Sequence, residues 1–89
     1  MSNLSNQIVK IGHKLHEINM TLPAKGEFVI DEAHQMIQVK VMEGLNTVYW
    51  EFIFLNEGWA EADARKIEHD LAMMITAARE SAMAVGAAA

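Results

Sequence analysis

The sequence predicts a small α+β domain in which two helices cover one face of a three-stranded antiparallel sheet. Three observations predict this class. Apolar residues recur every three or four positions towards both ends of the chain, which is the spacing of amphipathic helices. Between these segments the apolar period falls to two, the spacing of half-buried strands. Residues 47–55, TVYWEFIFL, combine aromatic and β-branched residues without Gly or Pro, which is typical of a strand inside a sheet.

A length of 89 residues, a formal net charge of −5 and the absence of cysteine limit the class of protein. A chain of this length forms one domain and buries roughly 60% of the surface that its unfolded form exposes. Its acids are spread along the chain and its cations are not clustered, which argues against direct binding to nucleic acid. Without cysteine, disulfides and thiolate metal sites are excluded. Because we find neither a signal peptide nor an apolar run that spans a bilayer, we expect a cytoplasmic protein without membrane contacts.

The first expected element is an amphipathic helix over residues 3–18. Its apolar positions are separated alternately by four and three residues, and they are Leu4, Ile8, Ile11, Leu15 and Ile18. Residues 16–22 also alternate between apolar and polar types, as a strand would. We end the helix near Ile18 and treat residues 19–25, which include Pro23, as the connection to the sheet.

Three strands are expected over residues 27–31, 35–42 and 47–55, joined by turns that form a meander. If residues 43–46 form the second turn, Met42 faces Thr47 and the two faces of the sheet separate by residue type. One face then turns Ile37, Val39, Val41, Phe28, Val48, Trp50 and Phe52 towards the helices, and we expect Trp50, Phe52, Phe54 and Trp59 to belong to the core. The opposite face carries Val29, Met36 and Ile53 in a row, with Met42, Tyr49 and Leu55 nearby.

A second helix is expected over residues 59–85, followed by a frayed tail over residues 86–89. At 1.5 Å per residue it would be roughly 40 Å long, whereas the longest strand would be about 30 Å, so one end should project beyond the sheet. Small residues recur four positions apart in that end, and they predict a homodimer that uses Met74, Ala78, Ala82 and Met83. The alternative is that the first helix of the same chain covers this strip.

The sequence contains little that indicates catalysis. It has no cysteine nucleophile, no G-x-S-x-G sequence and no glycine-rich phosphate loop, so we expect neither an enzyme nor a cofactor. His13 and His16 lie three residues apart, with Glu17 next to them. This H-x-x-H-E order differs from the H-E-x-x-H of zinc proteases, and a solvent-exposed helix face explains it better than a metal site.

The remaining surface for function is the face of the sheet that the helices leave uncovered. A face that mixes Tyr, Met and aliphatic side chains with a few charges is typical of protein recognition. We therefore predict a partner-binding surface there. It is extended by an acidic segment before and within the start of the second helix, which could contact a basic surface of the partner. Its residues are Val29, Met36, Met42, Tyr49, Ile53, Glu57, Glu61 and Asp63.

The order of one helix, three strands and one long helix in a small acidic chain is similar in general shape to two groups of proteins. One is the first half of type III secretion chaperones, and the other is the small phage-encoded inhibitors of host machinery, including anti-CRISPR proteins. This likeness in shape implies a non-catalytic inhibitor, adaptor or chaperone that binds a larger protein complex such as CRISPR-Cas. Two alternatives stay open: a metal or small-molecule site at a dimer interface, and a structural subunit of an assembly.

Overall fold

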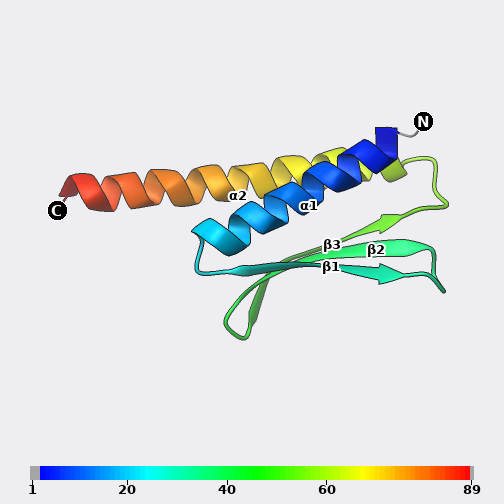
Figure 1. Cartoon of the computed structure of the whole chain (residues 1–89), viewed down its shortest axis with the longest axis horizontal. Helices are drawn as coiled ribbons and strands as arrows, with labels where there is room; N and C mark the ends of the chain where they lie inside the picture. The colour runs from blue at the N-terminus through cyan, green and yellow to red at the C-terminus, as the bar shows by residue number, and fades with distance from the viewer. Residues whose placement is uncertain (1–2, 89) are drawn as a thin grey trace.

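The structure, a computed structural model, describes the backbone of residues 3–88 and the side chains of residues 4–81. The chain folds in the predicted order of one helix, three strands and one helix, and the predicted α+β class is confirmed (Figure 1). The elements are α1 (Asn3–Thr21), β1 (Lys25–Asp31), β2 (Met36–Glu43), β3 (Asn46–Phe54) and α2 (Ala60–Ala88). All bounds lie within three residues of the prediction. α2 continues through residues 86–88, which we expected to fray, and residue 89 lies outside the described part of the chain.

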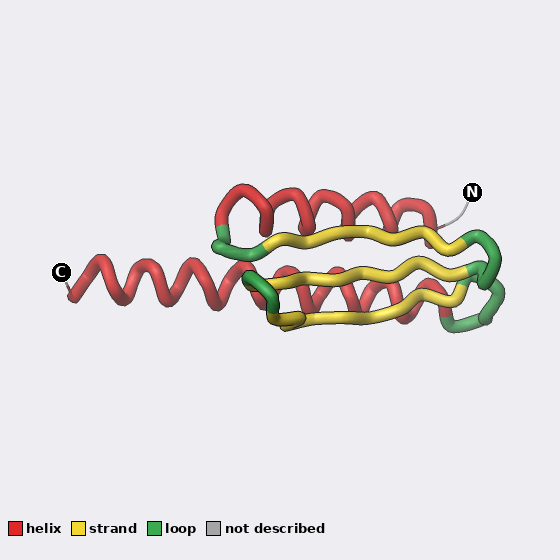
Figure 2. The backbone as a smooth tube through the Cα atoms, turned by 90° about the horizontal axis from the view of Figure 1, so that it is seen from below, coloured by secondary structure: helices red, strands yellow, loops and turns green. Residues whose placement is uncertain are grey.

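The three strands form an antiparallel meander in the order β1-β2-β3. Both helices lie on the same face of this sheet, and no element among residues 3–88 lies over the other face (Figure 1). β1 and β3 are the two edge strands. Seen from below, α2 continues well beyond the sheet and beyond α1 at its C-terminal end (Figure 2). No helix in the described part of the chain is long and apolar enough to cross a membrane.

The core lies between the helices and the inner face of the sheet. Aliphatic side chains fill it, since their apolar surface gains most from leaving water. The aromatic residues that we expected there are absent from the set of fully buried residues. Its members are Ile11, Leu15 and Ile18 of α1, Ile37, Val39 and Val41 of β2, Ile53 of β3, and Ala60, Ala64, Ile67, Leu71 and Ile75 of α2.

The predicted register of the second hairpin is wrong for most of β3. Met42 pairs with Thr47 as predicted, but Val41 pairs with Tyr49, so Val48 is an extra residue in the ladder. Such a β-bulge shifts all later pairs by one position, and a shift of one moves every side chain to the opposite face. Ile53 and Tyr49 therefore face the helices.

The same bulge places Trp50, Phe52 and Phe54 on the outer face, where Lys40, Gln38 and Met36 are their partners on β2. The predicted burial of these aromatics is therefore wrong. Trp50 is 52% exposed and Phe54 is 44% exposed.

The first hairpin differs from the prediction in a way that leaves its faces unchanged. Phe28 pairs with Val39, and Val29 pairs with Gln38. A tight turn at residues 32–33 predicts Ile37 and Met36 as their partners, which lie two positions away. Because side chains alternate with a period of two, a shift of two keeps each residue on its face. Val29 and Met36 accordingly lie on the outer face, as predicted.

The turn between β2 and β3 consists of Gly44 and Leu45. This two-residue turn is shorter than the expected loop of residues 43–46. Gly44 has a φ of 62°, a left-handed conformation that glycine adopts without the clash that a Cβ atom causes. This tight turn fixes the pairing of Glu43 with Asn46, and the bulge follows directly after it.

Candidate functional site

A row of three aromatic side chains runs along the outer face of β3. We call Trp50, Phe52 and Phe54 the aromatic row. The ring centroids of Trp50 and Phe52 lie 5.4 Å apart, and those of Phe52 and Phe54 lie 6.2 Å apart. These spacings fall in the range in which aromatic rings attract one another. The rings therefore support each other although the outer face leaves them partly in water.

Polar neighbours on β2 hold the Trp50 ring in place. Its Nε1 donates a hydrogen bond of 3.0 Å to Oε1 of Gln38. The Lys40 ammonium lies 5.3 Å from the centroid of the ring, which is a cation–π contact. A large aromatic side chain that is already ordered loses little entropy when a partner covers it.

One end of the aromatic row borders a hollow of about 430 Å³. Its wall is mostly apolar, and it is lined by Asp31, His34, Met36, Phe52 and Phe54. Nδ1 of His34 lies 2.8 Å from Oδ2 of Asp31. The hydrogen bond to His34 lowers the pKa of Asp31, so this end of the hollow carries a negative carboxylate at neutral pH.

Some of the predicted partner-binding residues on the sheet lie on the outer face, and others face the helices. Val29 is 42% exposed there, and Met36 and Met42 are half-buried. Ile53 is fully buried in the core, and Tyr49 is directed to α2, where its hydroxyl donates a hydrogen bond of 2.8 Å to Oδ2 of Asp70. The placement of Ile53 and Tyr49 on the outer face is therefore corrected.

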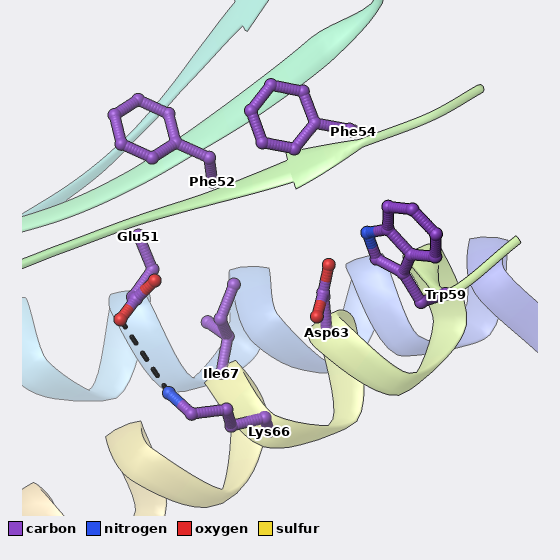
Figure 3. Close-up of a pocket in the computed structure, with 7 residues that line it drawn as sticks. All are labelled: Glu51, Phe52, Phe54, Trp59, Asp63, Lys66 and Ile67. Atoms are coloured by element: carbon purple, nitrogen blue, oxygen red, sulfur yellow. Dashed lines mark ion pairs between the residues drawn. The ribbon is translucent and has the colours of Figure 1, made fainter. Parts of the chain in front are cut away.

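A second concave site lies between the free edge of β3 and the start of α2 (Figure 3). We call it the β3–α2 groove. It has a volume of about 230 Å³ and is lined by Glu51, Phe52, Phe54, Trp59, Asp63, Lys66 and Ile67. Glu51 reaches down from β3 and Asp63 reaches up from α2, so two carboxylates approach the groove from opposite sides (Figure 3).

Lys66 is engaged by carboxylates other than Asp63. Its ammonium lies 3.1 Å from Oδ2 of Asp70 and 3.6 Å from Oε1 of Glu51. The hydrogen bond to Asp70, followed by the charges of Asp70 and Glu51, raises the pKa of Lys66, which keeps it protonated. Asp63 is half-buried, and its carboxylate pairs with no other side chain of the described residues. The groove therefore holds one acid without a counter-ion.

The other two predicted acids lie close to this groove. Glu57 is exposed in the connection to α2, and its backbone N–H donates to the carbonyl oxygen of Phe54. Glu61 forms an ion pair with Arg65 one turn along α2. The structure thus brings Glu57, Glu61 and Asp63 to one end of the molecule, but only Asp63 lines the groove.

The predicted dimer strip lies where α2 leaves the body of the domain. Met74 and Ala78 are half-buried and line a hollow of about 270 Å³ together with Leu22, Ala24, Val41, Glu43, Val48 and Ala77. The Arg79 guanidinium pairs with Glu17 in the last turns of α1, and α2 continues beyond the end of α1 (Figure 2). The side chains of Ala82 and Met83 lie outside the described residues.

His13 and His16 are exposed on α1, and Glu17 is engaged by Arg79. Within the described residues, no three His, Asp or Glu side chains come together in a geometry that could hold a metal ion.

Sequence reasoning missed the aromatic row and Trp59 as surface residues. In residues 47–55 both alternating sets are largely apolar, so periodicity alone does not say which set is buried. The set with the larger rings is the one expected in the core, whereas the bulge turns the other set inwards. Glu51 gives no warning of this, because a charge in an alternating pattern usually marks the exposed set. It can face inwards because β3 is an edge strand, where its carboxylate reaches Lys66.

No family model, curated protein or solved structure that we compared matches this chain.

Proposed function

We propose that this chain is a non-catalytic protein-binding module that binds its partner through the outer face of its sheet. The observation that carries the proposal is the aromatic row, which lies partly exposed on a face that no element of the described chain covers. Trp and Phe are enriched in the buried centres of protein interfaces, and a few such residues supply most of the binding energy. An inhibitor, adaptor or chaperone would use such a face to occupy a surface of a larger complex.

Single-stranded nucleic acid is the competing ligand for a row of exposed aromatic rings, because bases stack on such rings. The register that we expected from the sequence excluded it by burying the rings, and this reason no longer holds. Charge still argues against it. The neighbours of the row include one cation, Lys40, and it lies opposite Glu27 of β1, while Asp31 is at the other end. With a net charge of −5, the chain lacks the cationic track that phosphates require.

Replacing Trp50 and Phe54 with serine together is expected to abolish capture of the partner. Loss of interface residues of this kind weakens binding by about 2 kcal/mol or more, which is about thirtyfold. The measurement is affinity capture from a lysate with quantitative mass spectrometry, using the tagged wild type and the variant at equal concentration. Circular dichroism verifies that the variant is folded.

A matched control replaces two exposed apolar residues of α1, Val9 and Met20, which are 56% and 72% exposed. This control should retain the partner. Equal capture by the Trp50 and Phe54 variant would remove the outer face from the proposal. Tight binding of a labelled oligothymidylate by the wild type would favour the nucleic-acid alternative instead.

We also propose that two copies associate along the end of α2 that projects beyond α1 and the sheet. Replacing Ala78 with Glu places a charge in the apolar hollow at the base of this end, and the expected result is a shift from dimer to monomer in sedimentation velocity. Met73 is 56% exposed on another side of the same helix, so Met73→Glu is the control that should stay dimeric. A wild-type protein that sediments as a monomer would contradict this part of the proposal.

A further inference from the structure

The free edge of β3 lies beside the β3–α2 groove. β3 is an edge strand of nine residues without Pro, and in the described part of the chain no strand pairs with the edge that faces away from β2. A row of unpaired backbone groups on such an edge is a template for the addition of another strand.

The pairing of β2 with β3 shows which backbone groups of β3 are available. The N–H of Leu55 donates a hydrogen bond of 2.8 Å to the carbonyl oxygen of Gln35. In an antiparallel ladder the hydrogen-bonded pairs alternate with pairs that make no such bonds, so Ile53 and Glu51 also bond to β2. The N–H and C=O groups of Trp50 and Phe52 then point away from β2, towards the free edge. The β3–α2 groove begins at this edge, since Phe52 and Phe54 line it.

An added strand would divide its side chains between two environments. Residues directly opposite Trp50 and Phe52 share the outer face with the aromatic row, and the residues between them point inwards to α2. An inward side chain next to Glu51 or Ile53 would enter the β3–α2 groove. There it would meet Asp63, which has no counter-ion among the side chains that the structure describes, and the ring of Trp59, which is 57% exposed (Figure 3).

The charges that line the β3–α2 groove favour a cationic side chain of the added segment. The carboxylate of Asp63 lies on one side of the groove and that of Glu51 on the other, whereas the single cation, Lys66, is held by Asp70 and Glu51. A guanidinium or ammonium group gains from an acid without a counter-ion and from an aromatic ring face. A second copy of β3 fits less well, because pairing Trp50 with Phe52 of the copy places Glu51 directly opposite itself, and like charges in that position repel.

We propose that the β3 edge binds an extended, basic segment of the partner protein as a fourth strand, with an Arg or Lys side chain of that segment in the β3–α2 groove on Asp63. The proposal rests on the proposed function and adds the chemistry of the partner. It also explains how an acidic chain could occupy a basic surface of a larger complex, since the contact uses both main-chain hydrogen bonds and charge.

The test is a titration of the isotope-labelled protein with a short capped peptide in which Arg alternates with Val, followed by amide chemical shifts. In the expected result the amides of Trp50, Phe52 and Asp63 shift together, with a dissociation constant of about 1 mM or lower. Asp63→Asn is expected to weaken binding by about tenfold, because one charge-assisted hydrogen bond is lost. Glu80→Gln makes the same change of charge on an exposed part of α2 and should have no effect.

Two further peptides separate the roles of charge and main chain. Replacing each Arg by Glu should abolish binding, because the groove is acidic. N-methylation of the Val residues, which lie opposite Trp50 and Phe52, removes the donors to β3 and should weaken binding by about tenfold or more. This peptide tests strand addition without changing the protein.

Three outcomes would overturn the proposal: no amide shifts with the Arg peptide at about 5 mM, equal binding of the Glu peptide, or concentration-dependent broadening of β3 amides without peptide, which would assign the edge to a second copy. The proposed function is tested separately by the Trp50 and Phe54 variant. If that variant loses the partner while the Arg peptide does not bind, only the strand-addition proposal fails.

Discussion

Replacing Ile53 with alanine is expected to lower the free energy of unfolding by about 2–5 kcal/mol, the usual effect of truncating a large aliphatic side chain in a packed core. Ile53 is fully buried and is the one β3 residue in the buried core. A domain of this size has a total stability of about 4–13 kcal/mol, so the loss is a large part of it. The measurement is urea unfolding followed by far-ultraviolet circular dichroism, in which the midpoint should fall while the slope stays constant.

The matched variant is Trp50→Ala in the same strand. Trp50 has the larger side chain, but it is 52% exposed on the outer face, so its removal is expected to change the free energy of unfolding by about 1 kcal/mol or less. The register expected from the sequence predicts the reverse order, because it buries Trp50 and exposes Ile53. A larger loss for Trp50→Ala than for Ile53→Ala would show that the bulge at Val48 is not present in solution.

This pair of residues also shows how far the sequence determines the fold. The helices, the three strands and the covering of one face follow from apolar period alone, because each element must bury one side. The register of β3 does not follow, since the residue inserted at Val48 has no distinctive chemistry. A β-bulge depends on how the twisted hairpin meets the helices, which is a tertiary effect.

The candidate site was predictable to a similar degree. The outer face was recognised as the free surface, and Val29 and Met36 lie on it as expected. Ile53 and Tyr49 were assigned to it in place of Trp50 and Phe52, because a register error of one position exchanges both sets. The acids before and within the start of α2 follow from their order along the chain. Of these acids, only Asp63 reaches the groove. This selection depends on how α2 lies against β3, which the sequence does not show.

The aromatic row and the β3–α2 groove share the edge of one strand, and the bulge is what connects them. It turns Glu51 inwards to the groove and the rings of Trp50 and Phe52 outwards, so that one added segment could contact both. Without the bulge, Glu51 would face the solvent and the rings would fill the core. The local irregularity near the turn therefore decides which side chains the whole edge presents.

The bulge also directs Tyr49 inwards, and we expect its hydroxyl to resist ionisation in the folded protein. Partial burial, followed by the hydrogen bond to Asp70 and the negative charges of Asp70 and Glu51, raises the pKa of Tyr49 well above its usual value of 10.0. Tyr49 is the only tyrosine of the chain, so the near-ultraviolet absorbance of tyrosinate reports on this residue alone. In the native protein the band should be absent at about pH 11, whereas in urea it should appear with a midpoint near pH 10.

The sign of the pH dependence follows from the direction of this shift. A pKa that is raised in the folded state contributes stability that is fully present below the pKa of the unfolded state and is lost as pH rises through the folded pKa. The free energy of unfolding should therefore begin to fall above about pH 10. Burial raises the pKa of Asp70, but hydrogen bonds from Tyr49 and Lys66 outweigh it and lower the pKa, so the contribution of Asp70 is lost only at acidic pH below 3.8.

Tyr49→Phe separates this effect from general alkaline unfolding. The variant keeps the ring and removes the hydroxyl, so it is expected to be about 1 kcal/mol less stable at neutral pH and to depend less on pH in the alkaline range than the wild type. Unfolding by urea at a series of alkaline pH values measures both effects. If the tyrosinate band of the folded wild type instead appeared near pH 10, Tyr49 would be in water on the outer face, and the side-chain assignment of all of β3 would have to be reversed.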